Sequence, residues 1–82
     1  MLKVTAKNLE LRGIANRTKK DGTVYYLVNV EDHEGTPYQF YAKDSSPFDD
    51  GLRRGSVVDV EFSYRKFGQN ESLIVTHVSL SE

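Results

Sequence analysis

Two adjacent tyrosines, Tyr25 and Tyr26, follow a basic turn in the stretch RTKKDGTVYYLVNVED, residues 17–32. Side chains of a β-strand alternate between two faces, so one tyrosine faces the core and the other faces solvent. The even positions also carry Val24, Val28 and Val30 and no charge, which assigns Tyr26 to the core. Tyr25 then lies outward beside cations. An exposed ring of this kind can stack on a nucleobase while lysine and arginine contact phosphates.

The same alternation extends the outward surface to residues 38–43, where Phe40 and Ala42 form the inward set. If residues 23–31 and 38–43 pair antiparallel across the turn DHEGTP, their outward side chains form one flat aromatic patch. The predicted patch consists of Tyr25, Leu27, Asn29, Gln39, Tyr41 and Lys43, with Arg17, Lys19 and Lys20 at its margin. The patch favours binding of single-stranded nucleic acid. The alternatives are ordinary cross-strand neighbours or a tyrosine-rich protein interface.

A second candidate contact lies in RKFGQNES, where Arg65 and Lys66 precede Phe67 and Gly68. An aromatic ring flanked by basic residues at a loop tip suits a further stacking contact, which could extend to a strand bound by a neighbouring subunit. The alternatives are that Phe67 caps the barrel or packs across a dimer axis.

Catalytic and metal-binding patterns are not found in the sequence. His33 and His77 have no cysteine or paired carboxylates at ligand spacing, and no nucleophile has an adjacent base. His33 is interpreted as a solvated turn residue, whereas His77 is a candidate surface contact for a phosphate. Asp49 and Asp50 are interpreted as a cap or solvated turn. We therefore expect neither an enzyme, nor a cofactor, nor a bound metal.

The composition indicates one small domain spanning residues 1–82, with a formal net charge of −1 and no cysteine. Disulfides and thiolate metal sites are excluded, and no run is apolar enough for a secretory signal or membrane span. These features suit a cytoplasmic protein. Residues 1–22 carry net charge +4 and residues 23–82 carry −5, so a basic and an acidic face are expected. The alternative is a surface of mixed charge.

Alternating periodicity predicts five strands, over residues 2–18, 23–31, 38–43, 56–64 and 73–80. The parity of apolar residues changes around Asn8, so the long first strand should contain a bulge or sharp bend. In the fourth strand, the residues that should face inward are Val58, Val60, Phe62 and Tyr64. This layout predicts an all-β, five-stranded antiparallel, OB-like Greek-key barrel with an extended hairpin joining the last two strands. A small SH3-like barrel is the alternative.

The chain resembles the gene V type single-stranded DNA-binding proteins of filamentous bacteriophages. The resemblance runs over nearly the whole length. It is carried by the opening MLKV, the two arginines of RGIANR, the Gly-then-Tyr-x-Leu order in DGTVYYL, the lysine that ends the third strand, and the hairpin GQNESLIV. It implies an OB-like homodimer that binds single-stranded DNA cooperatively, with little sequence preference, and sequesters nascent phage strands in the host cytoplasm.

The resemblance also implies roles for individual residues. Arg12, Arg17 and Lys43 would contact phosphates, while Tyr25 and Leu27 would contact bases. Tyr38 occupies the position of an exposed tyrosine in that family, although strand alternation places Tyr38 with the inward set. His77 stands where the family has an arginine. The turn TKKDG is longer here, and the aromatic residue of the family's hairpin tip aligns with Asn70, so that Phe67 is the nearest aromatic ring.

The predicted function is therefore sequence-independent binding of single-stranded DNA. The alternatives are an OB module that binds another protein and an RNA-binding domain, because the choice between DNA and RNA depends on contacts near the 2′ position. The predicted contacts are Arg12, Arg17, Lys19, Lys20, Tyr25, Leu27, Tyr38, Tyr41, Lys43, Arg65, Lys66, Phe67 and His77.

Overall fold

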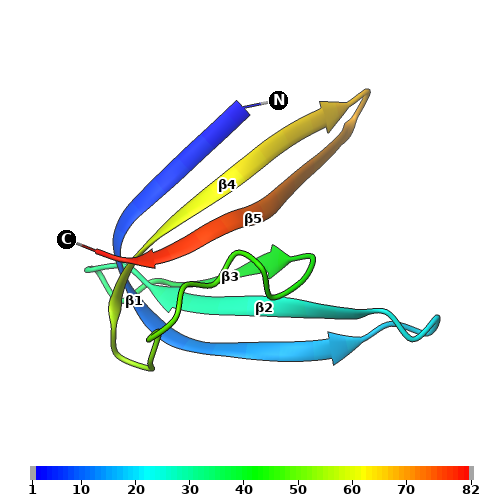
Figure 1. The fold of residues 1–82 in the computed structure, drawn as a ribbon. Coiled ribbons are helices and arrows are strands. Elements are labelled where there is room, and N and C mark those ends of the chain that lie inside the picture. The colour runs from blue at the N-terminus through cyan, green and yellow to red at the C-terminus, as the bar shows by residue number, and fades with distance from the viewer. Residues whose placement is uncertain (1, 82) are drawn as a thin grey trace.

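A computed structural model describes residues 2–81, and in this range the chain forms five strands and no helix (Figure 1). The strands are β1 (Leu2–Thr18), β2 (Val24–Glu31), β3 (Pro37–Ala42), β4 (Val57–Phe67) and β5 (Asn70–Leu80). They close into a barrel in the order β1-β2-β3-β5-β4. The predicted fold class is confirmed, with one difference: β3 pairs with β5 in parallel, so the sheet is mixed. Residues 2–81 contain no helix that could cross a membrane.

The long first strand bends, as the change of parity predicts, and therefore pairs with a different strand in each half. The first half of β1 pairs with β4 and the second half with β2. The register shifts between Ala6 and Leu9, where Asn8 has a positive φ of 59°. Asparagine tolerates this conformation better than most residues. The Asn8 N–H donates to Asp59 Oδ1 (3.0 Å), which fixes the bulge against β4.

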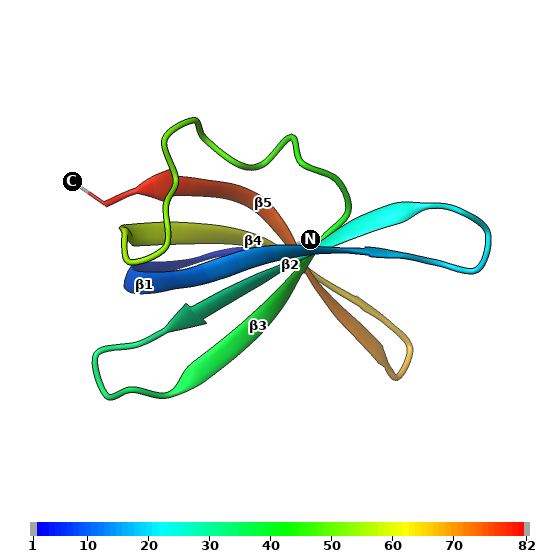
Figure 2. The same ribbon diagram turned by 90° about the horizontal axis from the view of Figure 1, so that it is seen from below.

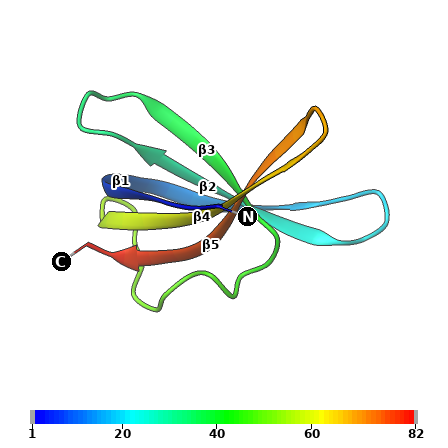
Figure 3. The same ribbon diagram turned by 90° about the horizontal axis from the view of Figure 1, so that it is seen from above.

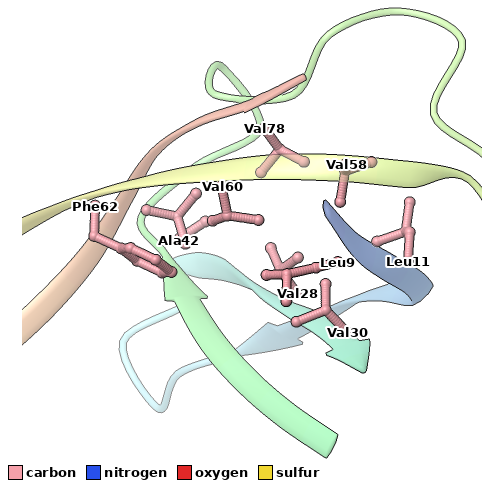
Figure 4. Packing of buried hydrophobic residues seen from close by; sticks show 10 residues of the cluster. Leu9, Leu11, Val28, Val30, Ala42, Val58, Val60, Phe62 and Val78 are labelled. Atoms are coloured by element: carbon pink, nitrogen blue, oxygen red, sulfur yellow. The ribbon is translucent and has the colours of Figure 1, made fainter. Parts of the chain in front are cut away.

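The core is built mainly from valines on the inward faces of β2, β4 and β5 (Figure 4). The predicted inward residues of β2 and β4 are confirmed at the centre of the barrel, where Val28, Val58 and Val60 have no exposed surface. Tyr26 packs against this core, and its ring meets Phe48 edge-on with centroids 5.7 Å apart. The buried apolar residues are Leu9, Leu11, Val28, Val30, Ala42, Val58, Val60, Phe62, Val75 and Val78.

Two hairpin arms extend beyond the barrel, β1–β2 and β4–β5, and they project from the same end of the molecule (Figures 1 and 3). The second arm is longer than the periodicity predicts, because Phe67 lies directly opposite Asn70 across a two-residue turn. Gly68 opens this turn with φ 58°, as a type II′ turn requires at its first position. The predicted extended hairpin is therefore confirmed.

The connection 43–56 runs beside β5 before it enters β4 (Figure 2). Its backbone is attached to β5 by two hydrogen bonds, from Val78 N to Pro47 O (2.8 Å) and from Asp49 N to Val78 O (3.1 Å). Phe48 and Leu52 from this connection pack against the core. The connection is therefore held against β5 and the core.

Candidate nucleic-acid interface

An aromatic platform lies on the outward face of β2 and β3, as alternation predicts. Leu27 lies directly opposite Tyr41, and the inward-facing Val28 lies opposite Phe40. The Tyr25 and Tyr41 rings are tilted by 32° with centroids 5.4 Å apart, so the two side chains form one surface. Tyr25, Leu27 and Tyr41 are half-buried rather than fully exposed, because they pack against one another. The platform is thus pre-formed.

The β1–β2 turn places a cation on this platform. Lys19 Nζ lies 5.8 Å from the centroids of both the Tyr25 and Tyr41 rings, within reach of a cation–π interaction. Arg17 lies directly opposite Tyr25 across the hairpin, and Lys20 is exposed in the turn. The predicted basic margin therefore adjoins the aromatic rings.

The cations beside the platform and on the β4–β5 arm are free to bind an anion. Among residues 2–81, the ion pairs within 4 Å involve Lys3, Arg12 and the two histidines only. No cation of this basic set has a carboxylate partner in that range; the set comprises Arg17, Lys19, Lys20, Lys43, Arg65 and Lys66. Unpaired surface lysines and arginines contact phosphates without first breaking an ion pair.

Two acids next to these cations are occupied by local turns. Asp21 accepts a hydrogen bond from the Thr23 backbone N–H (2.9 Å), which lowers the pKa of Asp21 below its usual value. Asp44, next to Lys43, accepts hydrogen bonds from the hydroxyl and backbone N–H of Ser46, and its pKa is lowered as well. Both carboxylates stay ionised at neutral pH but are directed toward the backbone.

Arg12 differs from the rest of the predicted phosphate contacts. Its guanidinium lies 3.0 Å from Glu10 Oε1 and 3.8 Å from Glu31 Oε2. Arg12 occupies the second irregularity of β1, between Leu11 and Gly13. The two carboxylates already neutralise this cation, so a phosphate would have to compete with them.

The β4–β5 arm carries a second aromatic–basic pair on its outward face. Phe67 is well exposed (67%), and the Arg65 guanidinium lies over its ring at 5.4 Å from the centroid. These two residues border a groove of about 390 Å³ that is also lined by Ser63, Ser72, Ile74 and Thr76. Lys66 has the opposite parity and lies across from Glu71, so the structure separates it from Arg65 and Phe67.

The seam at which β3 pairs with β5 in parallel joins the platform to this groove. Tyr41 of β3 lies directly opposite Ile74 of β5, and Ile74 lies opposite Ser63 of β4. Residues that are directly opposite share a face of the sheet. One outward surface thus runs from Lys19 over the tyrosines and Ile74 to Phe67. Ile74 was not predicted as a contact, because no local pattern in the sequence reveals which strands meet when a barrel closes.

Tyr38 is not part of this surface, in agreement with strand alternation and against the position implied by the resemblance. It lies on the same side of β3 as Phe40, with the two rings nearly parallel (8°) and their centroids 6.0 Å apart. Its hydroxyl donates to Asp32 Oδ2 (3.0 Å), and this hydrogen bond raises the pKa of Tyr38. Tyr38 is 41% exposed, so a contact with nucleic acid would need a second binding surface.

His77 lies in the barrel part of β5, opposite Glu61 and beside the connection 43–56. Its Nε2 lies 2.8 Å from Asp49 Oδ1. The pocket next to it is lined mainly by polar residues, including the carboxylates of Asp49, Asp50 and Asp59. Lys7 also lines this pocket, but its carboxylates outnumber its lysine, which makes it an unfavourable place for a phosphate. Asp49 is a hydrogen-bond partner of His77 rather than a solvated turn residue. Residues 2–81 contain no cluster of three metal-ligating side chains.

The closed five-stranded barrel, with its outward platform between two hairpin arms, defines an OB fold, whose β2–β3 face and flanking loops commonly bind oligonucleotides. Its structure is similar to the crystal structure of the mitochondrial single-stranded DNA-binding protein Rim1 from S. cerevisiae. The TM-score is 0.64 at 14% sequence identity, over 96% of this chain and 94% of that chain. No family model matches the chain, and no curated protein matches it significantly. This similarity establishes the fold alone.

Proposed function

We propose that this protein binds single-stranded DNA without enzymatic activity, largely independently of sequence. The observation that carries the proposal is the Tyr25–Tyr41 platform with Lys19 over both rings. The likeness of the whole barrel to a single-stranded DNA-binding protein supports it. RNA is the alternative ligand, because stacking and phosphate contacts serve either nucleic acid.

The platform supplies stacking and the flanking cations supply charge. Every nucleobase has a flat π-face, so Tyr25, Leu27 and Tyr41 can accept any base, at about 1–3 kcal/mol for each stacked base. The unpaired cations of both arms contact phosphates and release counterions, which makes affinity depend on salt. Phe67 in the groove provides a second stacking position, beyond the seam at Ile74.

We further propose that the protein is of the gene V type and acts in phage DNA replication, in the cytoplasm of the host. The order of the motifs from MLKV to GQNESLIV supports this assignment. A homodimer is part of the same proposal. Apolar side chains that are open to solvent support it: Leu2 is 64% exposed, Val4 45% and Leu73 46%. Leu2 and Leu73 both lie opposite Tyr64, so they share one face of the sheet. Sedimentation equilibrium measures the expected dimer directly.

A titration with fluorescein-labelled oligo-dT at two salt concentrations tests the proposed binding. We expect tight binding at low salt and a marked loss of affinity as salt rises. Absence of binding at low salt would contradict the proposal. Binding that is indifferent to salt would favour an OB module whose natural partner is a protein. A parallel titration with oligo-U distinguishes DNA from RNA as the preferred ligand.

A further inference from the structure

A pair of carboxamides extends the platform along β2 and β3. Asn29 lies directly opposite Gln39, two residues along each strand from the Leu27–Tyr41 pair and on the same outward face. Two residues of a strand span about 7 Å. The Gln39 Nε2–H donates to Asn29 Oδ1 (2.9 Å), so each amide holds the other in place. Asn29 is half-buried and Gln39 is exposed.

This pair keeps unused hydrogen-bonding groups directed at the ligand surface. A carboxamide has two donor hydrogens and an oxygen with two lone pairs, and the mutual hydrogen bond uses one donor of Gln39 and one lone pair of Asn29. The Gln39 oxygen, one Gln39 N–H and both Asn29 N–H groups have no other hydrogen-bond partner among residues 2–81. Because the amides are already ordered, a ligand that meets them loses little additional side-chain entropy.

We propose that Asn29 and Gln39 form a hydrogen-bonding site for the edge of a base stacked on Leu27 and Tyr41, and that this site favours adenine. The inference rests on the proposed binding of single-stranded DNA. A purine on the platform is long enough to extend toward the amides, whereas a pyrimidine in the same place ends short of them. Between the purines, a carboxamide matches adenine, because it can accept from N6 and donate to N7 at once.

The same pair therefore adds a base preference to a surface whose aromatic and cationic parts have none. Stacking tolerates any base, and a phosphate contact carries no sequence information. A hydrogen-bonding group beside the rings distinguishes bases by the donors and acceptors on their edges. The preference should be modest, because the amides remain open to water and a net hydrogen bond contributes little.

Affinities for oligo-dA, oligo-dT and an oligonucleotide of unsubstituted purine, which lacks the N6 amino group, test the site. We expect the double variant Asn29→Ala/Gln39→Ala to lose about tenfold more affinity for oligo-dA than for oligo-dT. The wild-type protein should bind the purine oligonucleotide more weakly than oligo-dA, and the double variant should bind these two equally. Asn16→Ala is the matched control, since Asn16 lies opposite the inward-facing Tyr26.

Equal losses for all three oligonucleotides, or no loss at all, would overturn the adenine site while leaving the proposed function intact. Failure of the wild-type protein to bind any of them would overturn the proposed function and the site together. The comparison of oligo-dA with the purine oligonucleotide uses the unaltered protein, so it stays decisive if the double variant does not fold.

Discussion

Replacing Tyr25 and Tyr26 separately by alanine distinguishes the two faces of β2. Tyr26 packs against the core and meets Phe48 edge-on, so Tyr26→Ala removes core contacts and an aromatic pair. For a half-buried ring we expect a loss of about 3 kcal/mol in the free energy of unfolding. Tyr25→Ala removes one contact with Tyr41 and one with Lys19, both near solvent. The corresponding loss should be about 1 kcal/mol.

The effects on binding should run in the opposite order. Removal of one stacking partner costs about 1–3 kcal/mol of binding free energy, or roughly 5- to 150-fold in affinity. Tyr25→Ala should therefore weaken binding of oligo-dT by this factor, whereas folded Tyr26→Ala should bind nearly as tightly as the wild-type protein. Urea denaturation followed by circular dichroism gives the stabilities. Anisotropy of a labelled oligonucleotide gives the affinities, because tyrosine emission would itself change with the substitution.

Equal losses of stability for the two variants would refute the assignment of faces. A loss of affinity confined to Tyr26→Ala would refute the proposal that the outward face binds DNA. Tyr41→Ala gives an independent check, because Tyr41 shares the platform with Tyr25 but lies on β3. Its affinity should fall by a similar factor.

Three further predictions concern charge, the second arm and pH. Lys19→Ala should reduce the salt dependence of binding to single strands by about 0.7 in the log–log slope, and titrations over a series of salt concentrations measure this slope. Phe67→Ala should weaken binding of oligonucleotides long enough to reach the groove while leaving the urea midpoint almost unchanged, since the ring is 67% exposed; an unchanged affinity would exclude the second stacking position. Hydrogen bonds hold the pKa of Asp32 below its ordinary value of 3.8, and the bond from the Thr36 backbone N–H has the largest effect. Their stabilising effect is therefore present above that pH and is lost as the pH falls below it, so the urea midpoint of Asp32→Asn should depend less on pH below about pH 4 than that of the wild-type protein.

The strand pattern and the faces could be predicted because both depend on local alternation. Valines at every second position of β2 and β4 require a buried face, which determines where Tyr25 and Tyr26 lie. The change of parity near Asn8 marks a real bulge, where the register of β1 against β4 shifts. Strand ends are less certain from sequence, and β5 begins at Asn70 rather than at residue 73, because a two-residue turn needs little sequence of its own.

The parts that could not be predicted depend on contacts between distant segments. Only closure of the barrel brings Ile74 opposite Tyr41 and so joins the platform to the groove. The ion pairs of Arg12 join neighbouring strands, and the partner of His77 comes from the connection 43–56. The resemblance implies a phosphate contact for Arg12, and His77 is a candidate surface contact for a phosphate. Pairing with carboxylates makes each of them a weaker candidate than Lys19.

Photo-cross-linking of an oligonucleotide that carries 5-iodouracil tests the central claim most directly, because this base couples to aromatic side chains that it touches. Tyr25, Tyr26, Tyr38 and Tyr41 all lie in the single tryptic peptide 21–43. Fragmentation of that cross-linked peptide by tandem mass spectrometry therefore assigns the residue in contact. The account predicts cross-links at Tyr25 and Tyr41, on the outward face of β2 and β3. Cross-links confined to Tyr38 or Tyr64, on the other face of the sheet, would contradict it.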